Sequence, residues 1–296
     1  MSAPLETRTV RTPDGRELCV EIAGEAAERT ILVHNGTPNS RHLYRPWIED
    51  AAARGVRLIS YDRPGYGGST PQPGHTVADG AADVRAIADE LEIESLAVWG
   101  LSGGGPYALA CAALLGDLVV AAAVLGSLAP WDAPDLDFLA GMGELNVEGI
   151  ERYFDDPERD REEGRERREE LLQTTAHEMR EQLESLLSDV DAAVLTGDFA
   201  EWLTRCTHDG LAPSDQGWWD DGVAHLSPWG FDLETIRVPV KVWHGRHDRF
   251  VPFQHGQWLA EHVPGAEAEL SESDGHLTLL TNRVPEVHAW LLEGGI

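Results

Sequence analysis

The sequence predicts a doubly wound α/β domain with a mostly parallel sheet, interrupted once by a helical insertion. Apolar, β-branched runs alternate with helical patterns over the first 130 residues, and this alternation implies parallel βαβ units with helices on both faces. The alternation stops between about 130 and 230, where the segment is helical, aromatic and highly charged, and it resumes near 238. We therefore expect a core domain of residues 1–130 and 231–296, with a helical cap formed by residues 131–230.

Each core element is expected from its own pattern. Apolar, β-branched runs predict strands at residues 17–22, 30–34, 56–62, 96–101, 119–126, 238–245 and 266–270. Helical periodicity predicts core helices near residues 40–53, 79–91, 104–115, 253–262 and 277–292. Inside the insertion, the run ERYFDDPERDREEGRERREELLQ pairs acidic with basic residues three or four positions apart, which is typical of a helix with a solvated face.

The charge balance limits the class of ligand. The chain has 52 acidic and 23 basic residues, a formal net charge of -29, and Lys241 is its one lysine. Such a surface repels nucleic acid, anionic membranes and polyanionic substrates. We therefore expect a neutral or cationic small-molecule substrate. The acidity itself fits either an ordinary acidic surface with a composition rich in Ala, Gly and Arg, or adaptation to high salt.

Cysteine spacing and the amino terminus indicate a cytoplasmic protein. Cys19, Cys111 and Cys206 are odd in number and far apart, so neither a disulfide framework nor a zinc site is expected. The first residues lack a basic segment followed by an apolar one, so no secretory signal is expected. The apolar stretch 108–129 is broken by Gly116-Asp117, which favours a buried helix, a turn and a strand over a membrane span.

The stretch VWGLSGGGPYALA (residues 98–110) fits two kinds of chemistry. Residues 103–108 satisfy the loose dinucleotide pattern G-x-G-x-x-G/A, but the next strand ends without the acidic residue that would hold a ribose. The alternative is the nucleophile elbow G-x-S-x-G, in which a strand turns sharply into a helix. The turn forces Ser102 to a positive φ, and Gly100 and Gly104 let strand and helix approach. We expect a nucleophilic serine and no cofactor.

A serine nucleophile needs a base, and the base needs an acid that orients it. Asp248, in GRHDRFVP, and His276, in SESDGHLTLL, each stand in a loop just beyond a predicted strand. In this architecture functional side chains gather at the carboxyl ends of strands, and the chain order Ser, Asp, His fits the elbow motif. His244 and His247 are three residues apart, but no partner at suitable spacing supports a metal site.

The oxyanion of a tetrahedral intermediate needs backbone N–H donors. Gly103 directly follows the nucleophile at the start of a helix, so its amide is one expected donor, helped by the helix dipole. The second donor is expected in the loop VHNGTPNS, residues 33–40, which follows a predicted strand.

Together these motifs make the sequence resemble the α/β-hydrolase fold superfamily, over essentially the whole chain outside the insertion. The matching stretches are HNGTP (34–38), DRPGYGGS (62–69), the elbow, Asp248 and His276. The resemblance implies an eight-stranded sheet, a cap inserted after the sixth strand and a catalytic site beneath the cap. The family's His-Gly-x-Pro loop here has Asn35 before its glycine. Alignment on Gly36 and Pro38 makes Thr37 the second N–H donor, with Gly36 as the fallback, and we interpret residues 62–69 as a structural turn.

The resemblance also narrows the reaction. Serine at the elbow disfavours the haloalkane dehalogenases and epoxide hydrolases of this superfamily, which place Asp there. It favours hydrolysis of a small, largely apolar carboxylic ester through an acyl-enzyme. Small esterases and the proline-iminopeptidase group are the nearest resemblance. Carbon–carbon bond hydrolases, perhydrolases and a slow-turnover binding protein or receptor share the same triad and stay open as alternatives.

Substrate choice is expected to belong to the insertion. Trp131, Trp218, Trp219 and Trp229 are expected to form part of an apolar pocket, because binding sites favour aromatic walls. The alternative is that most of these side chains fill the small core of the cap.

Overall fold

The fold is seen in a computed structural model that describes residues 5–25 and 29–293. Within these residues one eight-stranded sheet has the order β1-β2-β4-β3-β5-β6-β7-β8. The strands are β1 (Leu5–Arg11), β2 (Glu17–Ala23), β3 (Thr30–His34), β4 (Arg57–Tyr61), β5 (Leu96–Leu101), β6 (Val119–Leu125), β7 (Val240–Gly245) and β8 (Glu267–Ser271). Strand β2 runs antiparallel to β1 and β4, and every other pairing is parallel. The predicted mostly parallel sheet is confirmed.

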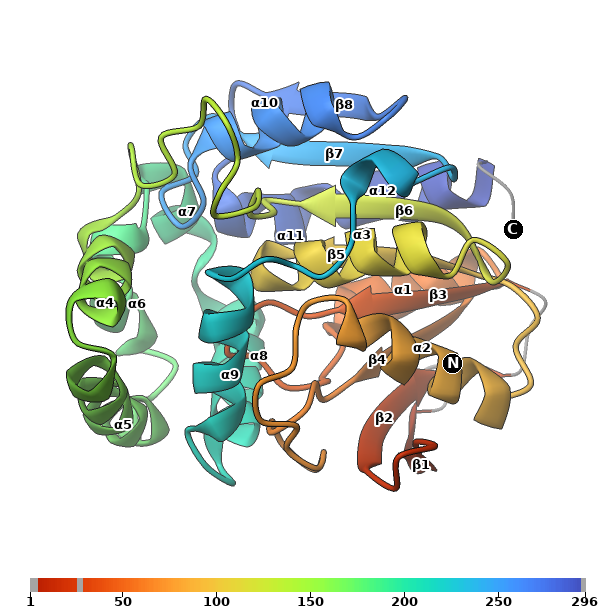
Figure 1. The fold of residues 1–296 in the computed structure, drawn as a ribbon, viewed down its shortest axis with the longest axis horizontal. Helices are drawn as coiled ribbons and strands as arrows, with labels where there is room; N and C mark the ends of the chain where they lie inside the picture. The colour runs from red at the N-terminus through yellow and green to blue at the C-terminus, as the bar shows by residue number, and fades with distance from the viewer. Residues whose placement is uncertain (1–4, 26–28, 294–296) are drawn as a thin grey trace.

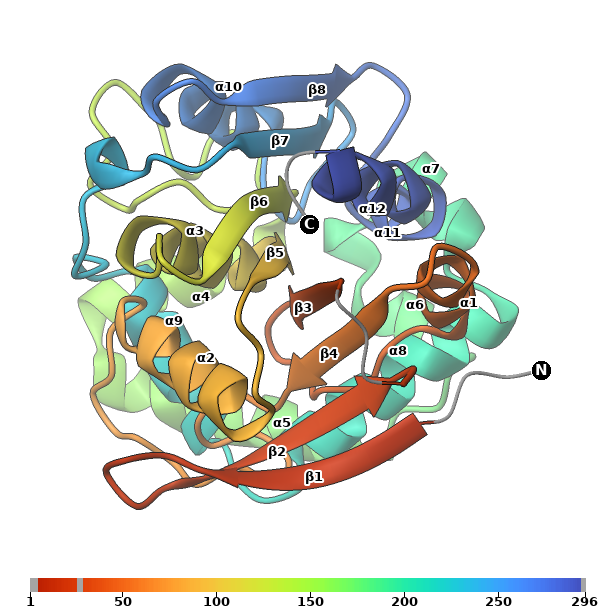
Figure 2. The ribbon, with the colours of Figure 1, turned by 90° about the vertical axis from the view of Figure 1, so that its right-hand side faces the viewer.

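Helices cover both faces of the sheet (Figure 2). One face carries α2 (Asp79–Glu90), α3 (Gly105–Leu114) and α10 (Phe253–His262), and the other carries α1 (Arg45–Ala53), α11 (His276–Asn282) and α12 (Val284–Glu293). Two apolar clusters fill the two interfaces, with Val98 and Leu109 in the first and Trp47 and Trp99 in the second. The central strands are buried on both faces, which is why their sequences read as continuous apolar runs.

Six α-helices connect β6 to β7 in the described chain and lie beyond the carboxyl ends of the parallel strands (Figure 1). They are α4 (Glu144–Asp155), α5 (Pro157–Gln173), α6 (Met179–Gln182), α7 (Asp189–Val194), α8 (Gly197–Leu211) and α9 (Gln216–His225). All six fall within residues 131–230. The charged run covers the end of α4 and all of α5. The two helices are divided at Asp156, whose carboxylate caps α5 by accepting from the Arg159 amide at 3.1 Å.

Three elements differ from the sequence prediction. Strand β1 was not predicted, because Val10 is its one buried side chain and a largely exposed edge strand has little apolar signal. The helix expected at 277–292 is two helices, α11 and α12, since Pro285 lies in the first turn of α12 and cannot donate within a continuous helix. Helix α1 begins at Arg45, five residues later than expected, because the preceding residues form a loop at the site.

None of the helices in residues 5–25 and 29–293 combines the length and the apolar character that a transmembrane span requires. The stretch 108–129 is divided between α3 and β6, as the sequence indicated.

Candidate active site

Ser102 stands on the sharp turn between β5 and α3. Its φ is 51°, in the left-handed region that costs a non-glycine residue conformational energy. Two residues before Ser102 and two residues after it, the neighbouring backbone leaves no room for a side chain. A Cβ added to Gly100 would overlap the Gly104 carbonyl, and one added to Gly104 would overlap the His34 carbonyl. The sequence around Ser102 therefore folds as the strained strand-to-helix turn that the elbow motif predicts.

Asp248 and His276 meet at the carboxyl ends of β7 and β8. His276 Nδ1 lies 2.6 Å from Asp248 Oδ2, and both residues are at least 95% buried. The other carboxylate oxygen, Oδ1, accepts from the amides of Phe250 at 2.9 Å and Val251 at 2.8 Å. This arrangement fixes the carboxylate so that one oxygen faces the imidazole. The loop after β7 thus orients Asp248, which in turn is bonded to His276.

The environment of His276 favours its protonated form. Burial disfavours the imidazolium, but the charge and hydrogen bond of Asp248 outweigh it and raise the pKa of His276 above the ordinary 6.5. The Phe250 ring stacks on the imidazole with centroids 4.6 Å apart. Beside the pair, Gly126 has φ 53°, and an added Cβ would lie 2.8 Å from His276 Nδ1. A side chain at position 126 would therefore push His276 away from Asp248.

Thr37 and Gly103 lie beside Ser102, in the loop after β3 and at the turn into α3. A Cβ added to Gly36 would come within 3.3 Å of Ser102 Cβ, so the loop passes directly over the nucleophile. One added to Gly103 would overlap Thr37 Oγ1, so the two expected donors are neighbours. Among residues 5–25 and 29–293 the Thr37 amide donates to no other group. Its hydrogen is free for a ligand.

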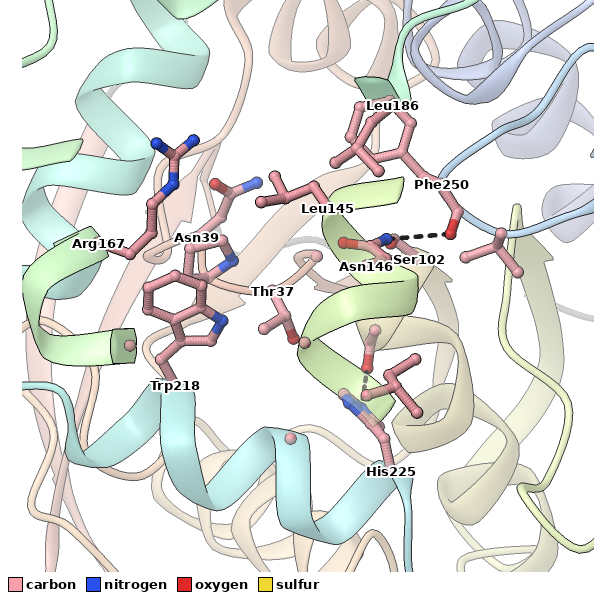
Figure 3. A pocket seen from close by; sticks show the side chains of 18 of the residues that line it. Thr37, Asn39, Ser102, Leu145, Asn146, Arg167, Leu186, Trp218, His225 and Phe250 are labelled. Atoms are coloured by element: carbon pink, nitrogen blue, oxygen red, sulfur yellow. Dashed lines mark hydrogen bonds between the residues drawn. The ribbon is translucent and has the colours of Figure 1, made fainter. Parts of the chain in front are cut away.

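A cavity of about 400 Å³ opens above these residues (Figure 3). Its lining includes Ser102, Gly103, Thr37 and His276, together with apolar side chains from the loops and the insertion. The apolar lining residues include Leu101, Leu128, Phe138, Leu145, Ile150, Leu186, Leu226, Phe250 and Val251. A volume of this size suits a small molecule. The structure therefore brings the predicted nucleophile, base and N–H donors to one largely apolar cavity.

Of the four tryptophans expected to form the pocket, Trp218 and Trp219 line the cavity and the other two do not. Trp131 instead packs on Phe138 and Phe154, with centroids 4.9 and 4.6 Å apart. Trp229 is buried in the core between sheet and helices. The sequence did not distinguish the tryptophans that line the cavity from those that pack elsewhere, because both kinds lie in apolar surroundings.

Helix α5 lines the cavity with charged residues, although a solvated face was expected for its whole charge run. Arg161, Glu163 and Arg167 are among the lining residues. Their charges are paired, since Arg161 contacts Asp215 at 3.3 Å and Arg167 contacts Glu170 at 3.0 Å. The cavity therefore combines apolar walls near Ser102 with a wall of neutralised ion pairs from α5.

Asp191 is a functional candidate that sequence reasoning missed. Its fully buried carboxylate, on α7, accepts from the backbone amides of His276 at 3.0 Å, Leu277 at 2.7 Å and Thr278 at 3.1 Å. These are the first amides of α11, which have no partners inside the helix. Asp191 thus caps the helix that carries His276. Its sequence context, SDVDAAV, signals only a local helix start at Ser188.

Asp221, on α9, is the second missed carboxylate. It is fully buried and pairs with Arg63 at 2.5 Å, and it accepts from the hydroxyls of Tyr66 at 3.0 Å and Tyr107 at 2.8 Å. Burial alone would raise the pKa of Asp221, but the Arg63 charge and hydrogen bonds from His75 and Arg63 hold it well below its usual range. Arg63 belongs to the loop 62–69, which therefore does more than form a turn.

The comparisons with known proteins agree with this fold. Residues 29–283 match the family described as alpha/beta hydrolase fold. The chain belongs to the α/β-hydrolase fold family. Membership identifies it as a hydrolase and confirms the fold that the sequence motifs predicted.

Relatives of this α/β hydrolase differ in the reactions for which they are named. A bifunctional esterase/perhydrolase from Acinetobacter calcoaceticus is 27% identical and covers 83% of each chain. A 2-hydroxy-6-oxononadienedioate/2-hydroxy-6-oxononatrienedioate hydrolase from Cupriavidus pinatubonensis is 25% identical over 86% of this chain and 82% of the relative. A thermophilic esterase structure from Thermogutta terrifontis has a TM-score of 0.71 at 20% identity, over 98% of this chain and 100% of that one. The structural likeness concerns the fold alone.

Proposed function

We propose that this α/β hydrolase cleaves small, largely apolar carboxylic esters through an acyl-enzyme on Ser102. The observation that carries the proposal is the shared cavity, which is lined by a strained serine, by a histidine bonded to a buried aspartate at 2.6 Å, and by apolar side chains. A relative named as an esterase/perhydrolase adds support.

Ser102 Oγ attacks the ester carbonyl carbon while His276 Nε2 takes the hydroxyl proton, and Nδ1–H donates to Asp248. The resulting oxyanion accepts from the amides of Thr37 and Gly103. The intermediate collapses when the alcohol leaves with the proton from Nε2. A water molecule then attacks the acyl-enzyme with His276 again as base, and the carboxylic acid departs.

A fluorophosphonate probe tests the nucleophile. We expect the wild-type protein to be labelled once, on Ser102, and a Ser102→Ala variant to be unlabelled and to lose ester hydrolysis, because the alanine has no oxygen to acylate. The measurement is intact-protein mass followed by peptide mapping. Equal labelling of the Ser102→Ala variant would remove Ser102 from the mechanism. Labelling without turnover of any p-nitrophenyl ester would favour the peptidase, carbon–carbon hydrolase or receptor alternatives.

The cavity predicts which esters are accepted. Gly149 and Gly164 line it from α4 and α5, and a Cβ added to either meets nothing within 4 Å. We expect Gly149→Leu to fold and to fill part of this space. The ratio of kcat/KM for p-nitrophenyl octanoate to that for the acetate should fall at least about tenfold, since misfit of a methylene or more costs that much in an apolar pocket.

The matched control is Gly116→Leu, since Gly116 also has open space around it but does not line the cavity. Its octanoate-to-acetate ratio should equal that of the wild type. An unchanged ratio in Gly149→Leu would mean that the substrate does not reach α4.

A further inference from the structure

Helix α9 contacts the catalytic loops along one face. Gly217, Asp221 and His225 are spaced four residues apart, so they lie on consecutive turns of the same side of the helix. A Cβ added to Gly217 would come within 2.6 Å of the Gly65 carbonyl carbon, so the helix backbone rests directly on the loop 62–69. Each of the next two turns sends a buried polar side chain toward the oxyanion donors.

Asp221 and Arg63 hold the loop that carries Thr37 by hydrogen bonds. The Thr37 hydroxyl donates to Asp221 Oδ2 at 2.9 Å and accepts from Arg63 Nη2 at 3.0 Å. Arg63 Nη1 also donates to the Asn35 carbonyl, two residues before Thr37. The loop is thereby held at its side chain and at its backbone. The hydrogen bonds at the Thr37 hydroxyl and at the Asn35 carbonyl also fix the direction of the Thr37 amide. The Gly36–Thr37 peptide lies between these two held groups and cannot rotate freely.

His225 makes a matching contact with the other donor. Its Nε2–H donates to the Gly103 carbonyl at 2.9 Å, and burial lowers the pKa of the ring. Figure 3 shows His225 and Trp218 projecting from the same helix, with Thr37 near them. Helix α9 therefore contacts both residues that are expected to supply the oxyanion donors.

Asp221 itself lies behind the site. It is absent from the residues that line the cavity, and its oxygens are occupied by Arg63, Tyr66, Tyr107 and Thr37. A carboxylate so enclosed neither touches substrate nor takes up a proton during turnover. Its contacts point to a role in the geometry of its neighbours.

We propose that Asp221 is a positioning residue: from α9 it holds Arg63 and Thr37 so that the Thr37 amide is aimed at the oxyanion. The inference rests on the proposed function, in which Thr37 is an oxyanion donor. Under this proposal the position of α9 against the core affects how well the transition state is stabilised, rather than how tightly the substrate binds. Loss of the Asp221 contacts should therefore act on kcat and leave KM nearly unchanged.

The test compares Asp221→Asn and Thr37→Val with the wild type on a p-nitrophenyl ester. Asp221→Asn removes the negative charge that pairs with Arg63. Thr37→Val removes the hydroxyl that is bonded to Asp221 and Arg63, and it keeps the backbone amide. We expect each to lower kcat by about 10²-fold, the scale of a lost oxyanion donor, with KM changed less than about threefold. Thr37→Val serves if the unpaired Arg63 prevents Asp221→Asn from folding.

Asp83→Asn is the matched control. Asp83 is also buried and paired with an arginine, Arg16 at 2.7 Å, but it contacts neither the loop 34–38 nor α9. It should lose stability and keep kcat within about twofold. Equal loss of kcat in Asp83→Asn, or unchanged kcat in both test variants, would overturn the inference.

A crystal structure of Asp221→Asn or Thr37→Val separates this inference from the proposed function. Displacement of residues 35–37 from their wild-type positions supports the positioning role, and an unmoved loop contradicts it, whether or not the enzyme accepts esters. Failure of the wild type to label with a fluorophosphonate or to hydrolyse any ester would instead reject the proposed function.

Discussion

Replacing Asp248 by Asn is expected to lower kcat by about 10⁴-fold, the effect of a triad aspartate in serine proteases, while the fold is retained. The amide oxygen can still accept from Phe250 and Val251, as Asp248 Oδ1 does at 2.9 and 2.8 Å. The amide nitrogen then faces His276 Nδ1 and donates to it. The imidazole proton is thereby moved to Nε2, which can no longer accept from Ser102. Steady-state kinetics and a melting curve check both parts.

The pH profile gives a second readout of the same variant. The pKa of His276 is raised above 6.5 in the wild type, and the base must be neutral, so kcat/KM should rise with pH through a midpoint above 6.5. Without the Asp248 charge, burial is opposed only by the weaker effect of the Asp191 charge, so the pKa of His276 should fall below its wild-type value. The residual activity of Asp248→Asn should therefore have its acid limb below that of the wild type. A shared midpoint, or a loss of kcat under about tenfold, would show that another group orients His276.

Replacing Asp191 by Ala is expected to lower the free energy of unfolding by about 3 kcal/mol. Three buried amides at the start of α11 lose their acceptor, and each unsatisfied group costs about 1–3 kcal/mol before water or local movement offsets part of it. The backbone of His276 is one of the three, so kcat should also fall, by about tenfold or more. Urea unfolding and ester kinetics measure the two effects.

Ser188→Ala is the control for this substitution. The Ser188 hydroxyl donates to Asp191 at 2.8 Å and caps α7, but it makes no contact with α11. We expect a loss of about 1 kcal/mol, as for an ordinary helix cap, with kcat unchanged. A loss of less than 1 kcal/mol in Asp191→Ala would mean that water replaces the carboxylate without cost.

Local patterns were enough to predict most of the core. The strands at 30–34 and 96–101 were expected at the bounds the structure gives, because buried parallel strands are continuous apolar runs with turns at both ends. The elbow could be predicted because its steric demand is local, with two glycines around one serine. Asp248 and His276 could be singled out because each lies a few residues beyond the end of a strand, although His276 is the first residue of α11 rather than part of a loop.

Contacts between distant segments could not be predicted in this way. Asp221 lies 158 residues from Arg63, and Asp191 lies 85 residues from His276. Nothing in the local sequence distinguishes these aspartates from the many other acidic residues of the insertion, since the residue type does not show whether a carboxylate is solvated or buried. The spacing of Gly217, Asp221 and His225 was the available signal, and it has meaning only once the loop that they contact is known.

The face of α9 also sets where this enzyme can be recombined with its relatives. Exchanging residues 144–173 would replace the walls that α4 and α5 give the cavity and would leave Asp191, Asp221 and His225 in place. Exchanging all of residues 131–230 would remove those three side chains with the walls. A chimera made by the smaller exchange should change its acyl preference and still turn over, whereas one made at the chain boundaries of the insertion has to rebuild its catalytic geometry.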